Sequence, residues 1–161
     1  MRKVVVNTSP LIALSGISAL TLLRDLYGEV MIPKAVYEEI SAKPESLCKR
    51  EVDRAADWIR VCPIQNILAK KLFQAKLHDG EVEAMILTQE QSADLLIIDD
   101  ALAKRHAEYL GINVTGTLGV LVKARQQNLI PALSPLLEQL QRNHIYISAQ
   151  LIRHCLRLVN E

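Results

Sequence analysis

Five oxygen-bearing side chains of this 161-residue sequence could together hold a metal ion: Asn7, Glu39, Glu81, Asp99 and Asp100. Carboxylates that share one pocket repel one another, and each is pushed toward protonation unless a hard cation neutralises the set. Mg²⁺ is the natural partner, because it prefers oxygen ligands. A metal held in this way lowers the pKa of a bound water, orients a phosphodiester and stabilises the leaving oxygen, and it needs no nucleophilic Ser or Cys.

Three of the five side chains directly follow predicted strands. The continuous apolar run Leu95–Ile98 ends at Asp99 and Asp100, and such a run is typical of a strand covered on both faces, as in a parallel sheet. The β-branched run Lys3–Val6 ends at Asn7. Because ligands of open α/β sheets bind beyond the carboxyl ends of the strands, we expect Asn7 to lie beside the acidic pair.

The other two carboxylates are on predicted helices. A helix over Pro33–Ser41 carries Glu39 beside its apolar stripe, at the edge of a core-facing surface. Asp79 is predicted to be the N-cap of a later helix that has Glu81 in its first turn. Glu83, two positions further, points nearly the opposite way, so at most one of these two glutamates can face the pocket. We expect Glu81 to be that residue, since the first turn faces the strand ends.

Each of these residues also has a purely structural explanation. Glu81 could simply complement the dipole of its helix. Asp99 and Asp100 could serve as an N-cap and a turn residue for the helix that follows. Glu39 could be an ordinary solvated helix residue. Taken singly, none of them distinguishes a metal site from local structure.

The chain as a whole alternates strands and helices, which indicates an α/β fold with a mainly parallel sheet. Its length, with 50% hydrophobic and 23% charged residues, predicts a single domain, 1–161. Residues 1–130 are the expected core. Residues 131–161 form a C-terminal extension with two amphipathic helices, Ser134–Arg142 and Ser148–Val159, which we interpret as a lid or a partner surface.

Three other stretches are predicted to be helical. One helical pattern starts at Leu11 and continues until Gly28. After a loop over Lys43–Lys49, a second helix buries Val52, Ala55, Ala56 and Ile59, and a short strand, Val61–Ile64, follows it. A third helix covers Ile67–Leu77.

The overall charge excludes one class of function. A formal net charge of +1 does not support nucleic-acid binding by bulk electrostatics, so any such contact must be local. Seven basic residues could provide it: Lys70, Lys71, Lys76, Lys104, Arg105, Lys123 and Arg125. Such charges are usually solvated faces.

Two other kinds of feature have no support in the sequence. The three cysteines lie far apart without metal-ligand spacing, so neither a zinc site nor a disulfide framework is indicated. No stretch approaches the roughly 18–20 uncharged apolar residues of a membrane-spanning helix, and we therefore expect a cytoplasmic protein.

Four short motifs occur in an order and spacing that resemble those of PIN domains. The first is Val4–Leu14, which reads VVVNTSPLIAL, and the second is Ile32–Ile40, which contains Glu39. The third and fourth are Asp79–Ala84 and Leu96–Asp100. The resemblance runs from Val4 to about residue 129, and the nearest similarity is to prokaryotic PIN-like proteins related to VapC-type toxins.

This resemblance implies a three-layer α/β/α fold and a metal-dependent endoribonuclease that uses Mg²⁺ or Mn²⁺. It also implies the toxin of a toxin-antitoxin pair, hence an antitoxin protein as a possible partner, and a homodimer. By the same resemblance, Glu39, Glu81 and Asp99 would be catalytic residues that bind the metal or orient its ligands, and Asp100 would be a substitute or supporting acid. Thr8 and Ser9 would orient the ligand on the first strand and the metal-bound waters.

The sequence departs from the PIN pattern at Asn7, where the wider family has Asp. An amide oxygen can bind a metal, but it contributes no charge, so metal affinity and water activation should both fall. A catalytically weak PIN-like module that binds RNA or an antitoxin-like protein is therefore the alternative function. A receiver-like phosphorylated domain fits less well, because Asn7 and Thr8 supply no acidic pair after the first strand.

Overall fold

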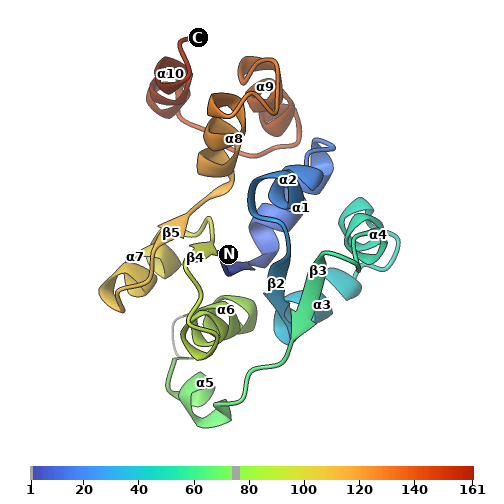
Figure 1. The fold of residues 1–161 in the computed structure, drawn as a ribbon, viewed down its shortest axis with the longest axis vertical. Coiled ribbons are helices and arrows are strands. Elements are labelled where there is room, and N and C mark those ends of the chain that lie inside the picture. Colours follow the sequence, from blue (N-terminus) through green and yellow to red (C-terminus); the bar gives the residue numbers. More distant parts are fainter. Residues whose placement is uncertain (1, 74–76) are drawn as a thin grey trace.

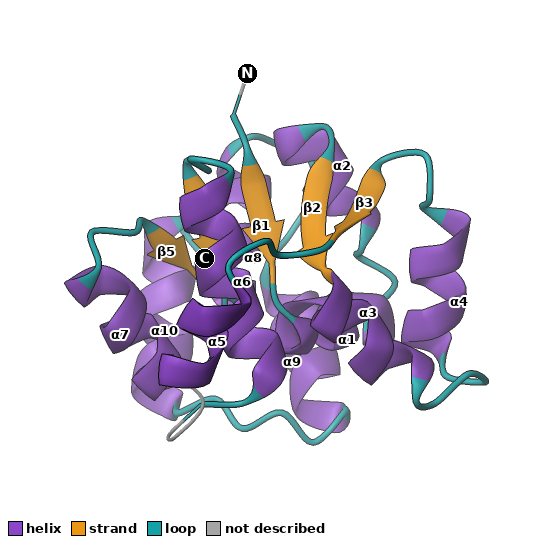
Figure 2. Ribbon diagram, turned by 90° about the horizontal axis from the view of Figure 1, so that it is seen from below, coloured by secondary structure: helices purple, strands orange, loops and turns teal. Residues whose placement is uncertain are grey.

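A parallel five-stranded sheet forms the centre of the computed structural model, which describes residues 2–73 and 77–161. Its order is β3-β2-β1-β4-β5, and every neighbouring pair runs parallel (Figure 2). The strands are β1 (Val4–Val6), β2 (Val30–Pro33), β3 (Ile59–Cys62), β4 (Leu95–Ile97) and β5 (Val114–Thr115). The predicted α/β fold with a parallel sheet is confirmed.

Helices cover both faces of this sheet and complete three layers (Figure 1). They are α1 (Thr8–Gly16), α2 (Thr21–Tyr27), α3 (Lys34–Ser41), α4 (Leu47–Arg54), α5 (Ile67–Phe73), α6 (Asp79–Glu90), α7 (Ala101–Tyr109), α8 (Thr117–Gln126), α9 (Ser134–Arg142) and α10 (Ala149–Leu158). One apolar cluster joins the sheet to α6 and α7, while another joins it to α1, α2, α8 and the C-terminal helices. The three-layer prediction is therefore confirmed.

The alternation of side chains along the central strands explains their uninterrupted apolar sequences. Val4 and Val6 belong to the cluster on one face and Val5 to the cluster on the other. In β4, Leu95 and Ile97 lie in the same cluster as Val4 and Val6, whereas Leu96 lies with Val5 in the cluster of α6 and α7. Successive residues of a strand point to opposite faces, so a strand covered on both sides needs an apolar residue at every position.

The predicted helical pattern from Leu11 to Gly28 is interrupted, because α1 ends at Gly16 and α2 begins at Thr21. Ser18 between them has a φ of 56°, a left-handed conformation that ends a helix. In the described parts of the chain, no single helix is long and apolar enough to cross a membrane; α1 and α2 meet that test only as a pair, bent by 115°.

The boundary predicted between helix and strand near Ile59 is wrong. Helix α4 begins at Leu47, where the Ser46 hydroxyl caps it by accepting a hydrogen bond from Lys49 N (3.1 Å), and it ends at Arg54. Ile59 is the first residue of β3 and pairs with Val30 of β2. Sheet pairing therefore overrides the local helical pattern at this position.

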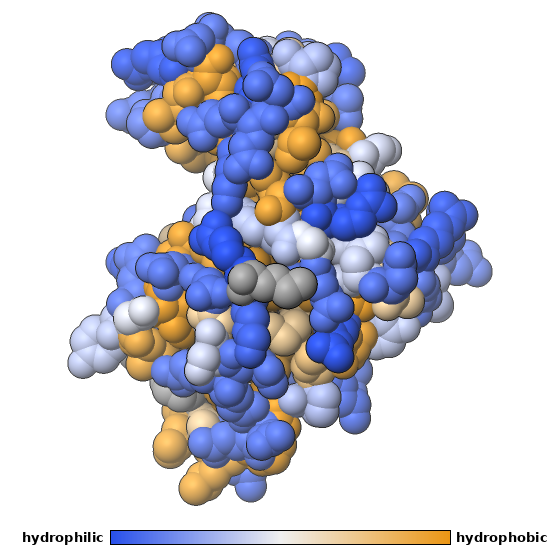
Figure 3. Space-filling model, in the orientation of Figure 1, coloured by the Kyte–Doolittle hydropathy of each residue, from blue (hydrophilic) through white to orange (hydrophobic). Residues whose placement is uncertain are grey.

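The predicted helix over Ile67–Leu77 is α5 as far as Phe73, and residues 74–76, including the predicted RNA-binding residue Lys76, lie outside the described ranges. Three apolar side chains of α5 are exposed: Ile67, Leu68 and Leu72. Figure 3 shows this apolar surface at the lower end of the molecule.

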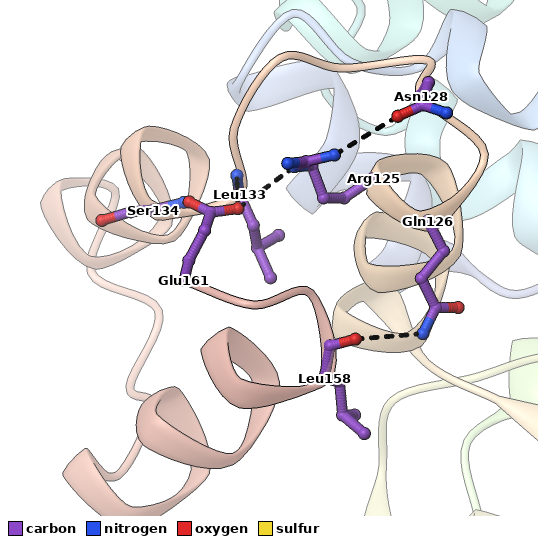
Figure 4. A network of polar contacts seen from close by, with 7 residues as sticks. All are labelled: Arg125, Gln126, Asn128, Leu133, Ser134, Leu158 and Glu161. Carbon is purple, nitrogen blue, oxygen red and sulfur yellow. Dashed lines mark hydrogen bonds and ion pairs between the residues drawn. The ribbon is translucent and has the colours of Figure 1, made fainter.

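The C-terminal extension packs against α8 and joins the main core. Leu137 and Leu140 of α9 and Cys155 of α10 are buried in the same cluster as the helices α1, α2 and α8. Figure 4 shows the polar contacts that fix it: Glu161 accepts hydrogen bonds from Leu133 N (2.8 Å) and Ser134 N (3.2 Å) and pairs with Arg125 (3.3 Å). These contacts join the end of the chain to the last turn of α8 and the start of α9.

Candidate active site

The carboxyl end of β1 places Asn7 directly beside the end of β4. Val6 is paired with Ile97, and Asn7 N donates a hydrogen bond to Ile97 O at 2.9 Å. Asp99 and Asp100 follow within three residues of this contact along β4. Asn7 and the acidic pair are therefore brought together at the edge of the sheet where ligands of parallel sheets bind.

Asn7 and Thr8 present buried oxygen atoms that have no protein partner. Asn7 is only 4% exposed and Thr8 9%, yet Asn7 Oδ1 and Thr8 Oγ1 accept or donate no hydrogen bond within the described chain. Asn7 is the N-cap of α1. The third residue of this helix is Pro10, which has no N–H to donate to a capping side chain. Since an unpaired buried polar group costs about 1–3 kcal/mol, these oxygens are well placed for a ligand.

Glu39 reaches this position from α3. Although the residue as a whole is exposed, its carboxylate packs against Gly80 at the start of α6. A Cβ added at Gly80 would collide with Glu39 Oε1 and would lie 3.4 Å from Thr8 Oγ1. The missing side chain at position 80 thus makes the space in which Glu39 and Thr8 approach each other.

Glu81 is buried beside the same group. The residue is 9% exposed, and its Oε2 accepts a long hydrogen bond from His78 N (3.4 Å). Burial raises the pKa of the Glu81 carboxyl, and the negative charges of Asp100 and Glu39 raise it further, against the opposing effect of the His78 N–H. The charges of Asp100 and Glu39 therefore act together with burial to disfavour the ionised form of Glu81.

The start of α6 differs from the prediction in one respect. His78, with extended backbone angles, is the N-cap, and Asp79 is the first helical residue rather than the cap. The reason is that Glu81 reaches back to His78 N, which fixes the cap one residue earlier.

Glu83 is turned away from the acidic group, as its spacing from Glu81 predicts. Its Oε1 accepts a hydrogen bond from Ala35 N in the first turn of α3 (3.1 Å), and its Oε2 pairs with Lys70 Nζ (2.6 Å). Glu83 thus connects α6, which carries Glu81, to α3, which carries Glu39. Sequence reasoning did not find this role, because the contact joins residues 48 positions apart.

Asp99 and Asp100 have different environments. Asp99 accepts hydrogen bonds from Thr117 N and Thr117 Oγ1, both at 2.7 Å, and so anchors the start of α8. Asp100 is the N-cap of α7 through Ala103 N (2.9 Å) and is the member of the pair whose charge affects Glu81. The capping function considered for this pair is therefore present at Asp100, together with its proximity to the acidic group.

The comparisons with known proteins agree with this arrangement. The family model described as DUF3368, a PIN domain, matches residues 3–161. The chain belongs to the PIN-domain family. Among solved structures, it is similar to a PilT N-terminus domain protein, SSO1118, from the hyperthermophilic archaeon Sulfolobus solfataricus P2. The identity is 20% and the TM-score 0.58, over 76% of this chain and 92% of that one, which supports the fold. No curated protein matches.

Membership of the PIN-domain family confirms the resemblance inferred from the four motifs, and it gives the chain a nuclease-type fold. PIN domains are generally nucleases and typically use divalent metals. Within residues 2–73 and 77–161, however, no three His, Cys, Asp or Glu side chains are grouped closely enough to hold a metal ion by themselves. The first-strand residue of this PIN domain is an uncharged Asn, so it contributes no carboxylate to such a group.

The donor set nevertheless suits a hard cation. Across the described ranges of the chain, it combines two buried oxygens without hydrogen-bond partners, on Asn7 and Thr8, with the Glu81 carboxyl, whose pKa is raised by burial and by the charges of Asp100 and Glu39. A divalent cation among them would satisfy the former and neutralise the latter. The residues present in this PIN domain therefore fit a hard divalent cation by their chemistry.

Two lysines near the site differ in whether they form ion pairs with carboxylates. Lys70 is occupied by Glu83 and lies 3.8 Å from Asp79. Lys104, half-buried on α7, has its Nζ against Gly116 and forms no ion pair with any residue that the structure describes. Lys104 is therefore a basic group of this PIN domain that can meet an anionic substrate.

Proposed function

We propose that this PIN domain is a metal-dependent endoribonuclease that hydrolyses RNA phosphodiester bonds with Mg²⁺ or Mn²⁺. The observation that carries the proposal is the pair of buried, unpartnered oxygens on Asn7 and Thr8. They lie near the Glu81 carboxyl, whose pKa is raised first by burial and then by the charges of Asp100 and Glu39.

Glu39, Glu81 and Asn7 would hold the metal through their side-chain oxygens, with Asp100 supplying a further negative charge. When bound, the metal would activate a water and stabilise the charge on the leaving oxygen. Asp99 stays a predicted catalytic residue; its hydrogen bonds to Thr117 support a role in fixing the end of β4 and the start of α8 around the metal. The hydroxyls of Thr8 and Ser9 would orient water or substrate at the same edge.

The neutral Asn7 supports a second candidate function. With one carboxylate fewer than the PIN pattern, the site would bind metal more weakly, and the chain would act by holding RNA or an antitoxin-like protein. The toxin-antitoxin role, the antitoxin partner, the homodimer and the cytoplasmic location all stay predictions from the sequence.

Cleavage of a mixed-sequence single-stranded RNA tests the proposal. The chain should cut with Mn²⁺ or Mg²⁺ and stop in EDTA. Glu39→Gln should lose most of the activity, whereas the matched control Glu38→Gln, an exposed neighbour 3.9 Å from Lys34, should keep it. Equal activity of the two variants, or cleavage that persists in EDTA, would contradict a metal-dependent reaction at this site.

A further inference from the structure

A cavity of about 550 Å³ opens beside the acidic group, and Ser9 and Asp99 of the candidate site line part of it. One wall is polar and comes from the strand ends: Ser9, Asp99, Lys104 and Gly116. The opposite wall is apolar and comes largely from the C-terminal extension, with Ile145, Tyr146 and Leu151. A cavity of this size is typical of sites for small molecules or for one unit of a polymer.

The polar wall is continuous with the candidate active site. Ser9 is the neighbour of Thr8, and Asp99 is the neighbour of Asp100, so the chain passes directly from one site to the other. A substrate strand lying over the metal ligands would therefore extend into the cavity within about one nucleotide, since consecutive residues are 3.8 Å apart.

Lys104 gives this wall a cation that forms no ion pair within residues 2–73 and 77–161. A Cβ added at Gly116 would lie 2.8 Å from Lys104 Nζ and 2.7 Å from Asp99 Oδ1. Both groups therefore border the space left by this glycine. Both oxygens of Asp99 already accept hydrogen bonds from Thr117. The half-buried ammonium therefore remains available to a phosphate at the cavity mouth.

The apolar wall leaves an aromatic ring open to solvent. Tyr146 is 89% exposed although it borders a cavity, and Ile12 and Leu151 at the same cavity are 52% and 41% exposed. A flat ligand would bury these surfaces, and an unpaired nucleobase stacks on tyrosine whatever its identity. The apolar wall thus suits the base of a nucleotide, and the lysine opposite it suits the phosphate.

We propose that this cavity binds one nucleotide of single-stranded RNA, with its base against Tyr146 and its phosphate at Lys104. The inference rests on the proposed ribonuclease function and assigns it a substrate subsite. It assigns the C-terminal extension a role in substrate binding, because Tyr146 and Leu151 of the extension line the same cavity as Ser9 and Asp99. The charge of Lys104 favours a nucleotide over an apolar peptide, which would leave the ammonium unpaired.

Binding measured in EDTA tests the subsite without any cleavage. The four ribonucleoside 5′-monophosphates, ribose 5-phosphate and inorganic phosphate are titrated to millimolar concentration by NMR. At least one nucleotide should bind more tightly than ribose 5-phosphate. Tyr146→Ala should weaken nucleotide binding about tenfold and leave phosphate binding unchanged, as expected for loss of one stacking contact. Lys104→Gln should weaken both.

Two variants serve as matched controls. Tyr109→Ala removes a tyrosine that is 91% exposed and lies outside the cavity, and Arg142→Gln removes an exposed cation of α9 that does not line the cavity. Both should bind nucleotides as the unaltered chain does. Tyr146→Phe should also retain binding, because the stacking face is preserved.

The inference is overturned if no nucleotide binds, if nucleotides and ribose 5-phosphate bind alike, or if Tyr146→Ala and Tyr109→Ala have the same effect. A cavity that takes a leucine-rich peptide but no nucleotide would also overturn it. Failure of the ribonuclease proposal has a different signature: RNA is not cut with metal, yet nucleotide binding in EDTA still depends on Tyr146, and the subsite stands.

Discussion

Glu83 accepts a hydrogen bond from the backbone N–H of Ala35 at 3.1 Å and so links the two helices that carry Glu81 and Glu39. Its other oxygen pairs with Lys70 at 2.6 Å, and the Glu83 side chain is 9% exposed. A carboxylate in the middle of α6 thus caps the start of α3. The relative position of the two proposed metal ligands depends on this contact.

Replacing Glu83 with Ala should therefore destabilise the fold. The loss of a buried cap and a charge-assisted hydrogen bond should lower the free energy of unfolding by about 1–3 kcal/mol. Urea denaturation measures this change. The control Glu38→Ala removes only an exposed ion pair and should stay within about 0.5 kcal/mol of the unaltered protein. A similar effect of the two variants would show that the Glu83 contact is unimportant.

Gly80→Ala should separate stability from function. Alanine favours a helix over glycine by up to about 1 kcal/mol, and the colliding atom is the end of a flexible Glu39 side chain, so thermal stability should stay constant or rise. The same methyl group displaces the Glu39 carboxylate, and Mn²⁺ affinity should fall. Calorimetry and metal titration of one sample measure both. Unchanged Mn²⁺ affinity would contradict the proposed role of Glu39.

Glu81→Gln should stabilise the metal-free protein. The substitution removes the repulsion from Asp100 and Glu39 and the cost of burying a charge, a gain of about 0.5–1 kcal/mol in the free energy of unfolding. In EDTA the variant should melt at a higher temperature than the unaltered chain. With Mg²⁺ added, the unaltered chain should gain stability and the variant little. A lower melting temperature of Glu81→Gln in EDTA would argue against electrostatic repulsion at this site.

The contacts of Glu161 predict a pH dependence of stability. The N–H of Leu133, then that of Ser134 and the Arg125 guanidinium, lower the pKa of the Glu161 carboxyl below its ordinary value. A depressed folded-state pKa contributes stability above the unfolded-state pKa, and this contribution is lost as the pH falls through the folded-state value. Glu161→Gln should thus narrow the difference in melting temperature between neutral and acidic pH. An unchanged difference would mean that these contacts are weak in solution.

Much of the fold could be predicted because its signals are local. Strands covered on both faces have uninterrupted apolar sequences, as in Leu95–Ile97, and the boundaries of α9 agree with the predicted helix Ser134–Arg142. The end of the α4 segment could not be predicted in this way. Ile59 fits a helical pattern, and only its pairing with Val30 makes it part of a strand.

The candidate site was predictable to the extent that its residues follow strands or open helices. Asn7, Glu81 and Asp100 are found by that rule. Thr117 and Gly80 are not, because their roles depend on contacts across the fold: Thr117 holds Asp99 from 18 residues away, and Gly80 makes space for Glu39. A sequence pattern of helix and strand periods carries no information on such contacts.

The central claim, metal-dependent cleavage of RNA at this acidic group, is tested most directly at Asn7. Cleavage of a mixed-sequence single-stranded RNA is followed with Mn²⁺, Mg²⁺ or EDTA for the unaltered chain, Asn7→Asp and Asp99→Ala. We predict that the unaltered chain cuts only with metal, that Asn7→Asp cuts about tenfold faster because it adds a charged ligand, and that Asp99→Ala is inactive. If only Asn7→Asp cuts, or if none of the three cuts, the claim is contradicted and the chain is a binding module.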